Sequence, residues 1–236
     1  MYPLSHIYVS YCALNQMDPP TALGSVLPDI LVGTGIPWRK AHRSTEAPFQ
    51  QYLISPALRL GAALHGIDLP GLDYFSDISY RNGKGYAYQK ATFIEKDVIA
   101  LGVQPEHAAW RGHNFIEMAM EIKLSRQHPQ LWQYLEEAQN GTNLLGQVEE
   151  LARALEATYP EKVPQVLQRF LTIRGKEEAL ARDYANKLNN FYSLSIDPAA
   201  CQTIIAKCLD IIEADCQSFL SEAIDALRQG LAQGLS

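Results

Sequence analysis

The sequence predicts an all-α protein, and three observations indicate this. Apolar residues recur at intervals of three and four along most of the chain, prolines stand where helices would begin, and strand signals are rare. With 236 residues, 47% of them hydrophobic, the chain is long enough for one sizeable core. We therefore expect a single all-α domain, a multi-helix bundle, over residues 1–236. All 6 histidines lie in the first 128 residues. We expect the chemistry within residues 1–125 and a helical scaffold over 126–236.

The N-terminal half begins with an apolar segment over residues 7–14, and a second apolar run, 23–27, precedes Pro28 and Asp29. Ser55 followed by Pro56 is typical of a helix N-cap with proline in the first turn, and it predicts a helix to residue 66. Pro105 similarly predicts a helix to about residue 125. Between them, residues 79–93 combine an Asn-Gly pair with alternating tyrosines, which indicates either a short hairpin or a long functional loop.

The C-terminal half carries further helix signals. Asn140 and Gly141 end a helix that starts at Pro129, and Thr142 or Asn143 is expected to cap the next. Asp197 and Pro198 start the last and longest helix. The expected ranges are 129–138, 144–158, 164–173, 177–191 and 198 to about 231.

Charge and cysteine content exclude several function classes. A formal net charge of −6 offers no long-range attraction for nucleic acid or anionic lipid, so we expect no extended nucleic-acid surface. No apolar stretch approaches the roughly 20 residues of a membrane span, and the first residues lack the pattern of a signal peptide. We expect a cytoplasmic protein. The four cysteines contain no Cys-x-x-Cys pair and are expected in the core: Cys12, Cys201, Cys208 and Cys216.

Histidine and carboxylate spacing predicts a metal site. His113 and Glu117 are four residues apart in an expected helix, which places both side chains on one face, and their neighbours are apolar. His65 lies at the end of a nearly all-apolar helix and is expected to point inward. Asp29 suits either a ligand or a helix cap. The expected ligands of a divalent cation, Zn or alternatively Mn or Fe, are His6, Asp29, His42, His65, His113 and Glu117.

Other residues suit acid–base and charge-neutralising roles beside such a metal. Asp68 or Asp73 is a candidate general base, and Arg111 a candidate for neutralising charge in the transition state. An ion pair within its helix is the alternative for Arg111, and a solvated surface run is the alternative for residues 39–43. The candidate substrate-binding cations are Arg39, Lys40, Arg43, Arg81 and Lys84.

The order of these residues resembles a known superfamily. The chain is similar to the zinc-dependent phospholipase C and single-strand nuclease superfamily, most of all to its uncharacterised bacterial members. The features that carry this similarity are, in order, an N-terminal histidine, Leu-Pro-Asp at residues 27–29, a basic segment with His42, His65 with a nearby aspartate, and the His113–Glu117 pair. The similarity covers residues 1–125. It implies an all-α zinc site that hydrolyses phosphodiesters. The family has His-x-x-x-Asp at its centre, whereas Leu69 follows His65 by four.

A second resemblance concerns residues 64–77, which are similar to acyl-carrier-protein phosphodiesterases. Both resemblances imply a metal-dependent phosphoester hydrolase that acts on a phosphorylated small molecule or a phosphodiester. The alternative is a helical ligand-binding or interaction protein without catalysis, which has kept a vestigial or structural metal site. The long amphipathic C-terminal helix would also suit a homodimer interface.

Overall fold

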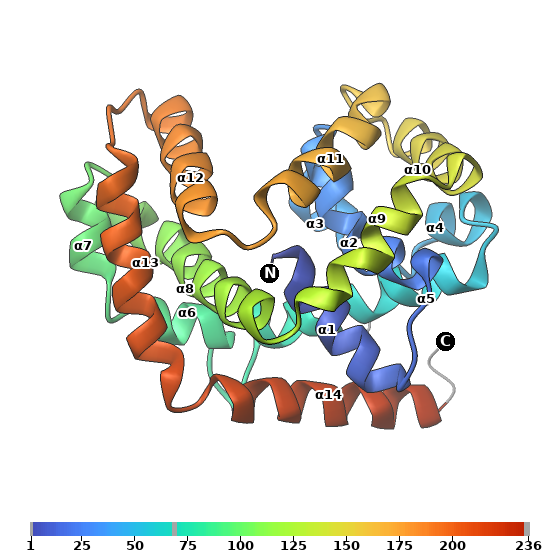
Figure 1. The fold of residues 1–236 in the computed structure, drawn as a ribbon, viewed down its shortest axis with the longest axis horizontal. Coiled ribbons are helices and arrows are strands. Elements are labelled where there is room, and N and C mark those ends of the chain that lie inside the picture. The colour runs from blue at the N-terminus through green and yellow to red at the C-terminus, as the bar shows by residue number, and fades with distance from the viewer. Residues whose placement is uncertain (1, 68–69, 234–236) are drawn as a thin grey trace.

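A computed structural model, which describes residues 2–67 and 70–233, confirms the all-α prediction (Figure 1). Within these ranges there is no strand, and the sole β-type pairing is a bridge between Tyr80 and Gly83. No helix of the described chain has the length and apolar character that crossing a membrane requires.

The helices follow one another along the chain with short connections. The first part contains α1 (Pro3–Leu14), α2 (Pro19–Gly33), α3 (Trp38–Ala41), α4 (Ala47–Tyr52) and α5 (Pro56–His65). The middle contains a π-helical turn η1 (Tyr74–Ile78), α6 (Tyr86–Ala91), α7 (Glu95–Ala100) and the long α8 (Pro105–Gln127). The last part contains η2 (Pro129–Leu131), α9 (Trp132–Gln139), α10 (Thr142–Ala154), η3 (Pro160–Lys162), α11 (Val163–Ile173), α12 (Glu177–Tyr192), α13 (Pro198–Glu213) and α14 (Cys216–Ala232).

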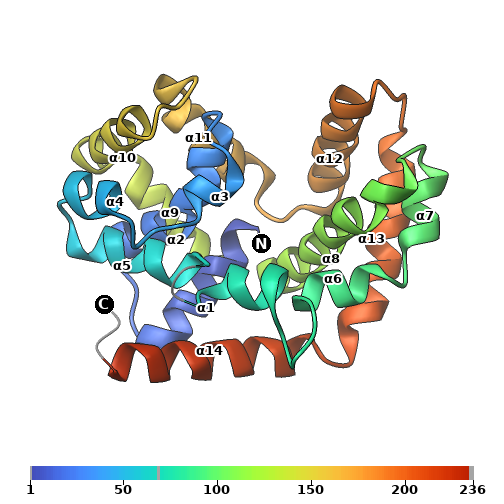
Figure 2. The same ribbon diagram turned by 180° about the vertical axis from the view of Figure 1, so that it is seen from behind.

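Two groups of helices form the molecule, as both views show (Figure 2). One group contains α2 to α5 and α9 to α11, and the other contains α6 to α8, α12 and α13. Helix α1 lies between them, and α14 runs along one side beneath both groups. The buried apolar side chains form one continuous cluster through both groups. Helices α11 and α12 therefore face each other from opposite groups.

Helices α2 and α5 cross at unusually close range because both have glycine at the crossing. A Cβ atom added to Gly24 would lie 2.2 Å from the carbonyl oxygen of Leu58, and one added to Gly61 would lie 2.3 Å from that of Thr21. This approach brings the backbone of Ser25 within hydrogen-bond distance of the His65 ring. The glycines thus set the position of one expected ligand.

Residues 79–93 form neither a hairpin with extended strands nor a long loop. Arg81 and Asn82 have φ of 48° and 62° and make a tight turn closed by the Tyr80–Gly83 bridge, and the chain then enters α6. The tyrosine alternation misleads because Tyr86 is buried and stacks on Phe219 of α14 with 4.2 Å between ring centroids. A tertiary contact, and not strand pairing, accounts for this tyrosine.

The expected final helix is interrupted. It ends at Glu213, and α14 begins at Cys216. Asp215 in the corner accepts a hydrogen bond from the Tyr86 hydroxyl at 2.8 Å and pairs with Lys90 at 2.6 Å. These contacts hold the corner that turns α14 beneath the rest of the molecule.

The structure also tests the expected helix at residues 144–158 and the expected burial of the cysteines. Helix α10 begins at Thr142 with Gly141 as its N-cap and without a side-chain cap, and it ends at Ala154, four residues earlier than expected. The left-handed backbone of Glu156, φ 61°, stops it. The four cysteines are free, with Cys12 half-buried and the other three buried, as expected of core residues.

Candidate metal centre

A buried carboxylate, Asp73, lies at the centre of the site. Its oxygens lie 3.0 Å from Nε2 of His42, 3.3 Å from Nε2 of His6 and 3.3 Å from Nε2 of His65. All four side chains are almost completely buried, at 0–1% exposure. The structure therefore brings three of the expected ligands together around an aspartate that had been expected to act as a general base.

Four separate elements carry these side chains. His6 lies in α1, His42 follows the last residue of α3, His65 ends α5, and Asp73 precedes η1. His65 occupies the inward position that the apolar sequence of its helix predicts. Convergence from four elements gives the cluster a rigid frame, because each element packs into the common core.

Two of the imidazoles are anchored through Nδ1. Nδ1 of His42 lies 2.8 Å from the carbonyl oxygen of Trp38, and Nδ1 of His65 lies 2.6 Å from that of Ser25. A carbonyl only accepts, so each Nδ1 donates its hydrogen. In a neutral imidazole this leaves a lone pair on Nε2, the atom that faces Asp73. Histidine ligands of metals are oriented in this way.

The three histidines around Asp73 are incompletely hydrogen-bonded. The Nε2 atoms of His6, His42 and His65 form no hydrogen bond of good geometry within the described ranges, despite their short distances to Asp73. Burial, followed by the charge of His65, lowers the pKa of His6 well below its usual range, which favours its neutral form. The rings of His6 and His65 stack with 3.4 Å between centroids, a contact unfavourable for two cations. A bound cation would accept these nitrogen lone pairs, and the Asp73 carboxylate is placed to bind the same ion.

Asp29 joins this cluster from α2. One of its carboxylate oxygens lies 3.8 Å from Nε2 of His42, and ligand atoms of Asp29, His42 and His65 all lie within 4.8 Å of one another. Asp29 stands in the interior of α2, directly after Pro28, so it does not cap a helix. Burial raises its pKa, and the nearby His65 and His42 act in the opposite direction. Asp29 is therefore positioned as a ligand.

A second group of ligand atoms forms around the pair with which the metal prediction began. Those of His113, Glu117 and Asp77 lie within 4.8 Å of one another. His113 and Glu117 point inward from α8, at 7% and 3% exposure, as their apolar neighbours predict. The Ser76 hydroxyl donates to Glu117 at 3.1 Å, and the Tyr88 ring stacks on His113 at 4.5 Å. Burial and then the charge of Glu117 raise the pKa of Asp77 well above its usual range.

The turn η1 connects the two groups. Asp73 precedes it and Asp77 lies within it, so five residues of π-helix direct one aspartate to each group. The sequence signal for both residues is weak, because they follow His65 by 8 and 12 positions and not by the four that the family resemblance implies. Asp68, the other expected general base, lies outside the described residues.

A cavity of about 800 Å³ opens beside these groups. Asp29, Asp77, His113 and Glu117 line it, whereas Asp73 does not. Residues of α11 and α12 form much of the opposite wall. A ligand in the cavity would therefore reach one side of the metal cluster, while Asp73 stays enclosed among imidazoles.

Two of the expected cationic residues line this cavity. Arg39 belongs to α3, three residues before His42, and Arg111 belongs to α8, two residues before His113. The Arg111 side chain forms no ion pair within its helix; its Nε donates to the Tyr192 hydroxyl at 2.7 Å. Both positions are compatible with contact to an anionic ligand.

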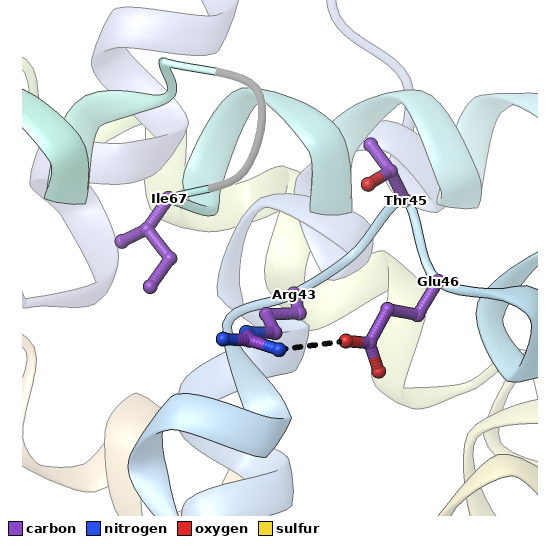
Figure 3. A pocket seen from close by; sticks show the side chains of 4 residues that line it. All are labelled: Arg43, Thr45, Glu46 and Ile67. Atoms are coloured by element: carbon purple, nitrogen blue, oxygen red, sulfur yellow. Dashed lines mark hydrogen bonds and ion pairs between the residues drawn. The ribbon is translucent and has the colours of Figure 1, made fainter.

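The other expected substrate-binding cations lie elsewhere. Arg43 pairs with Glu46 at 3.2 Å in a shallow surface hollow that Thr45 and Ile67 complete (Figure 3). Lys40 donates to the carbonyl oxygen of Leu155 at 2.9 Å and pairs with Glu156 at 3.3 Å. The solvated-surface alternative thus describes these two residues, although Arg39 beside them lines the cavity.

The turn at residues 80–83 also lies outside the cavity. Arg81 pairs with Glu222 of α14 and is exposed, and Lys84 is not among the residues lining the cavity. Neither side chain contributes to the wall of the cavity. From this segment it is Tyr88, in α6, that lines the cavity.

Glu121 is a structural part of the site that sequence reasoning missed. It is fully buried in α8 and accepts hydrogen bonds from the backbone of Leu4 at 2.9 Å, the backbone of Ser5 at 3.0 Å and the Ser5 hydroxyl at 3.1 Å. It therefore caps the start of α1, just before His6. Burial raises the pKa of Glu121 to about 7, although these hydrogen bonds oppose the shift. The sequence feature that could have indicated an inward-facing Glu121 is its spacing, because it follows Glu117 by four residues and so lies on the same helix face.

No family model matches the chain, and no characterised protein and no solved structure shows significant similarity to it.

Proposed function

We propose that the protein is a metal-dependent phosphoester hydrolase. One observation carries the proposal: two buried imidazoles, His42 and His65, are anchored through Nδ1 to backbone carbonyls and turn Nε2 to the same carboxylate, Asp73. If the imidazoles are neutral, each Nε2 lone pair faces a carboxylate oxygen of Asp73, and two acceptors repel each other at these distances. A divalent cation between the nitrogens and the carboxylate would make each contact favourable.

The donor set suits a borderline divalent cation. Imidazole nitrogens with carboxylate oxygens bind Zn, Mn and Fe, and Zn is the ion that the family resemblance implies. His6, Asp29, His42, His65 and Asp73 would hold one part of the centre. Asp77, His113 and Glu117 would hold the other.

A divalent cation bound here supplies a water of lowered pKa and polarises a phosphoryl oxygen. The chain's own residues perform the remaining tasks. Asp73 is enclosed and absent from the cavity wall, which favours a ligand over a general base. Arg39, on the wall beside His42, would neutralise charge that develops on the phosphoryl group. The apolar part of the wall would exclude bulk water.

Metal content of the untagged protein tests the proposal. We expect at least about one equivalent of Zn, Mn or Fe by elemental mass spectrometry, lost in His65→Ala and kept in His128→Ala. His128 is a suitable control because it stacks on Tyr8 and lies outside the cavity and the clusters. The wild type should hydrolyse bis(4-nitrophenyl) phosphate, and chelation should abolish this activity until metal is restored.

Less than about 0.2 equivalents of metal in the wild type would contradict the proposal. A full metal complement without hydrolysis of any phosphoester would instead favour the alternative, a helical binding protein with a structural metal site.

A further inference from the structure

Arg111 is an unusual residue in the cavity wall because it is a buried cation without an anionic partner. Its side chain is 6% exposed, and Nε donates to the Tyr192 hydroxyl. No carboxylate pairs with its guanidinium among the residues that the structure describes. A buried charge is costly unless it is paired, so an anion bound at this place would relieve the cost.

Three aromatic rings surround the guanidinium and fix its plane. Its carbon lies 3.7 Å from the ring centroid of Trp110, 4.8 Å from that of Phe191 and 5.2 Å from that of Tyr192. Cation–π contacts of this kind compensate part of the desolvation of Arg111 but leave its Nη groups available as donors. The arginine is thus held in place before a ligand arrives.

Lys187 of α12 supplies a second cation in the same cavity wall. Its ammonium group forms no ion pair in the described chain. Desolvation of its ammonium group by the surrounding cavity wall, followed by the charge of Arg111, lowers the pKa of Lys187, although part of the side chain stays exposed. Two further cations line the cavity near α11 and α12, and both are paired with carboxylates: Arg169 with Asp183, and Arg174 with Glu136.

We infer that Arg111 and Lys187 form a subsite for a phosphate group. Two neighbouring cations match the charge of about −2 on a phosphate monoester better than the single charge of a carboxylate. The planar guanidinium can bind two phosphate oxygens side by side. Because this subsite and the metal ligands share one cavity, the substrate is a phosphoester that carries an additional phosphate. This substrate assignment rests on the proposed function, whereas the subsite itself does not.

Binding of inorganic pyrophosphate to the metal-free protein tests the subsite. The full chain is stripped with a chelator, dialysed and titrated by calorimetry. We expect wild-type binding, weakened about tenfold or more by Lys187→Gln and by Arg111→Lys, which keeps the charge but removes the paired donors. Lys187 is exposed, so its variant should keep the native fold, which circular dichroism checks. Lys96→Gln makes the same charge change on the exposed surface of α7 and should change affinity less than about twofold.

Several results would overturn the inference. These are an absence of pyrophosphate binding to the metal-free protein, equal effects of Lys187→Gln and Lys96→Gln, and malonate binding as tightly as pyrophosphate, which would assign a carboxylate site. The outcomes separate the two proposals. Metal-dependent hydrolysis without pyrophosphate binding removes only the subsite, and Lys187-dependent binding by a protein that never takes up metal removes only the hydrolase.

Discussion

Replacing Gly61 with alanine tests how helix packing positions the site. The new Cβ would lie 2.3 Å from the carbonyl oxygen of Thr21 and 2.6 Å from the amide nitrogen of Ser25, about 1 Å closer than the 3.4 Å at which ordinary contact begins. Both atoms belong to the backbone of α2, so neither can rotate away. Helix α5 must move by roughly this amount.

The expected magnitude combines two destabilising effects with one stabilising effect. Overpacking costs about 1–3 kcal/mol, and weakening the 2.6 Å hydrogen bond between His65 and Ser25 costs about 1–2 kcal/mol more. The helix propensity of alanine returns about 1 kcal/mol. We therefore expect a net loss of about 1–4 kcal/mol in the free energy of unfolding. Metal affinity should fall as well, because His65 is displaced.

Urea denaturation followed by circular dichroism measures this loss. Gly146→Ala is the matched control, because that glycine lies in α10 with nothing within 4 Å of an added Cβ. The same substitution there should stabilise the protein by about 0.5–1 kcal/mol. Destabilisation of less than about 1 kcal/mol by Gly61→Ala, or the same sign of effect in both variants, would refute the reasoning.

Two further predictions concern groups that are not metal ligands. Glu121→Ala removes three hydrogen bonds at the start of α1 and should lower the free energy of unfolding, measured by urea denaturation, by about 3–5 kcal/mol. The control, Glu137→Ala on the exposed face of α9, should change it by no more than about 0.5 kcal/mol. Similar losses in both variants would contradict the capping role. Burial raises the pKa of the Cys201 and Cys208 thiols to about 12, so the native protein should alkylate them with iodoacetamide far more slowly than the half-buried Cys12 at the same pH. Mass spectrometry of peptides gives the rates, and equal labelling of the three would show that the core is open.

Features set by neighbours in sequence were predictable. Proline and cap residues mark helix starts because they act on the first turn, and α5 begins at Pro56 with Ser55 as its cap, while α13 begins at Pro198 with Asp197 as its cap. Helical spacing likewise puts His113 and Glu117 on one face, and the apolar residues beside them turn that face inward.

Features set by contacts between distant segments were not predictable. The corner at Asp215 depends on Tyr86 and Lys90, more than 120 positions away, and Glu121 caps a helix that begins 118 residues earlier. The unusual spacing between His65 and Asp73 can be interpreted only once η1 is seen to turn both Asp73 and Asp77 inward.

By itself, the sequence determined the all-α class, the starts of helices such as α5, α8, α12 and α13, and the types of side chain available for a metal site. The tertiary structure decided which of them meet: His6, Asp29, His42 and His65 gather around Asp73, His113 and Glu117 join Asp77, and Arg43 and Arg81 turn to the surface. The physical reason is range. Capping and periodicity act within a few residues, whereas convergence on Asp73 depends on the close crossing of α2 and α5 and on the packing of α1 against α8.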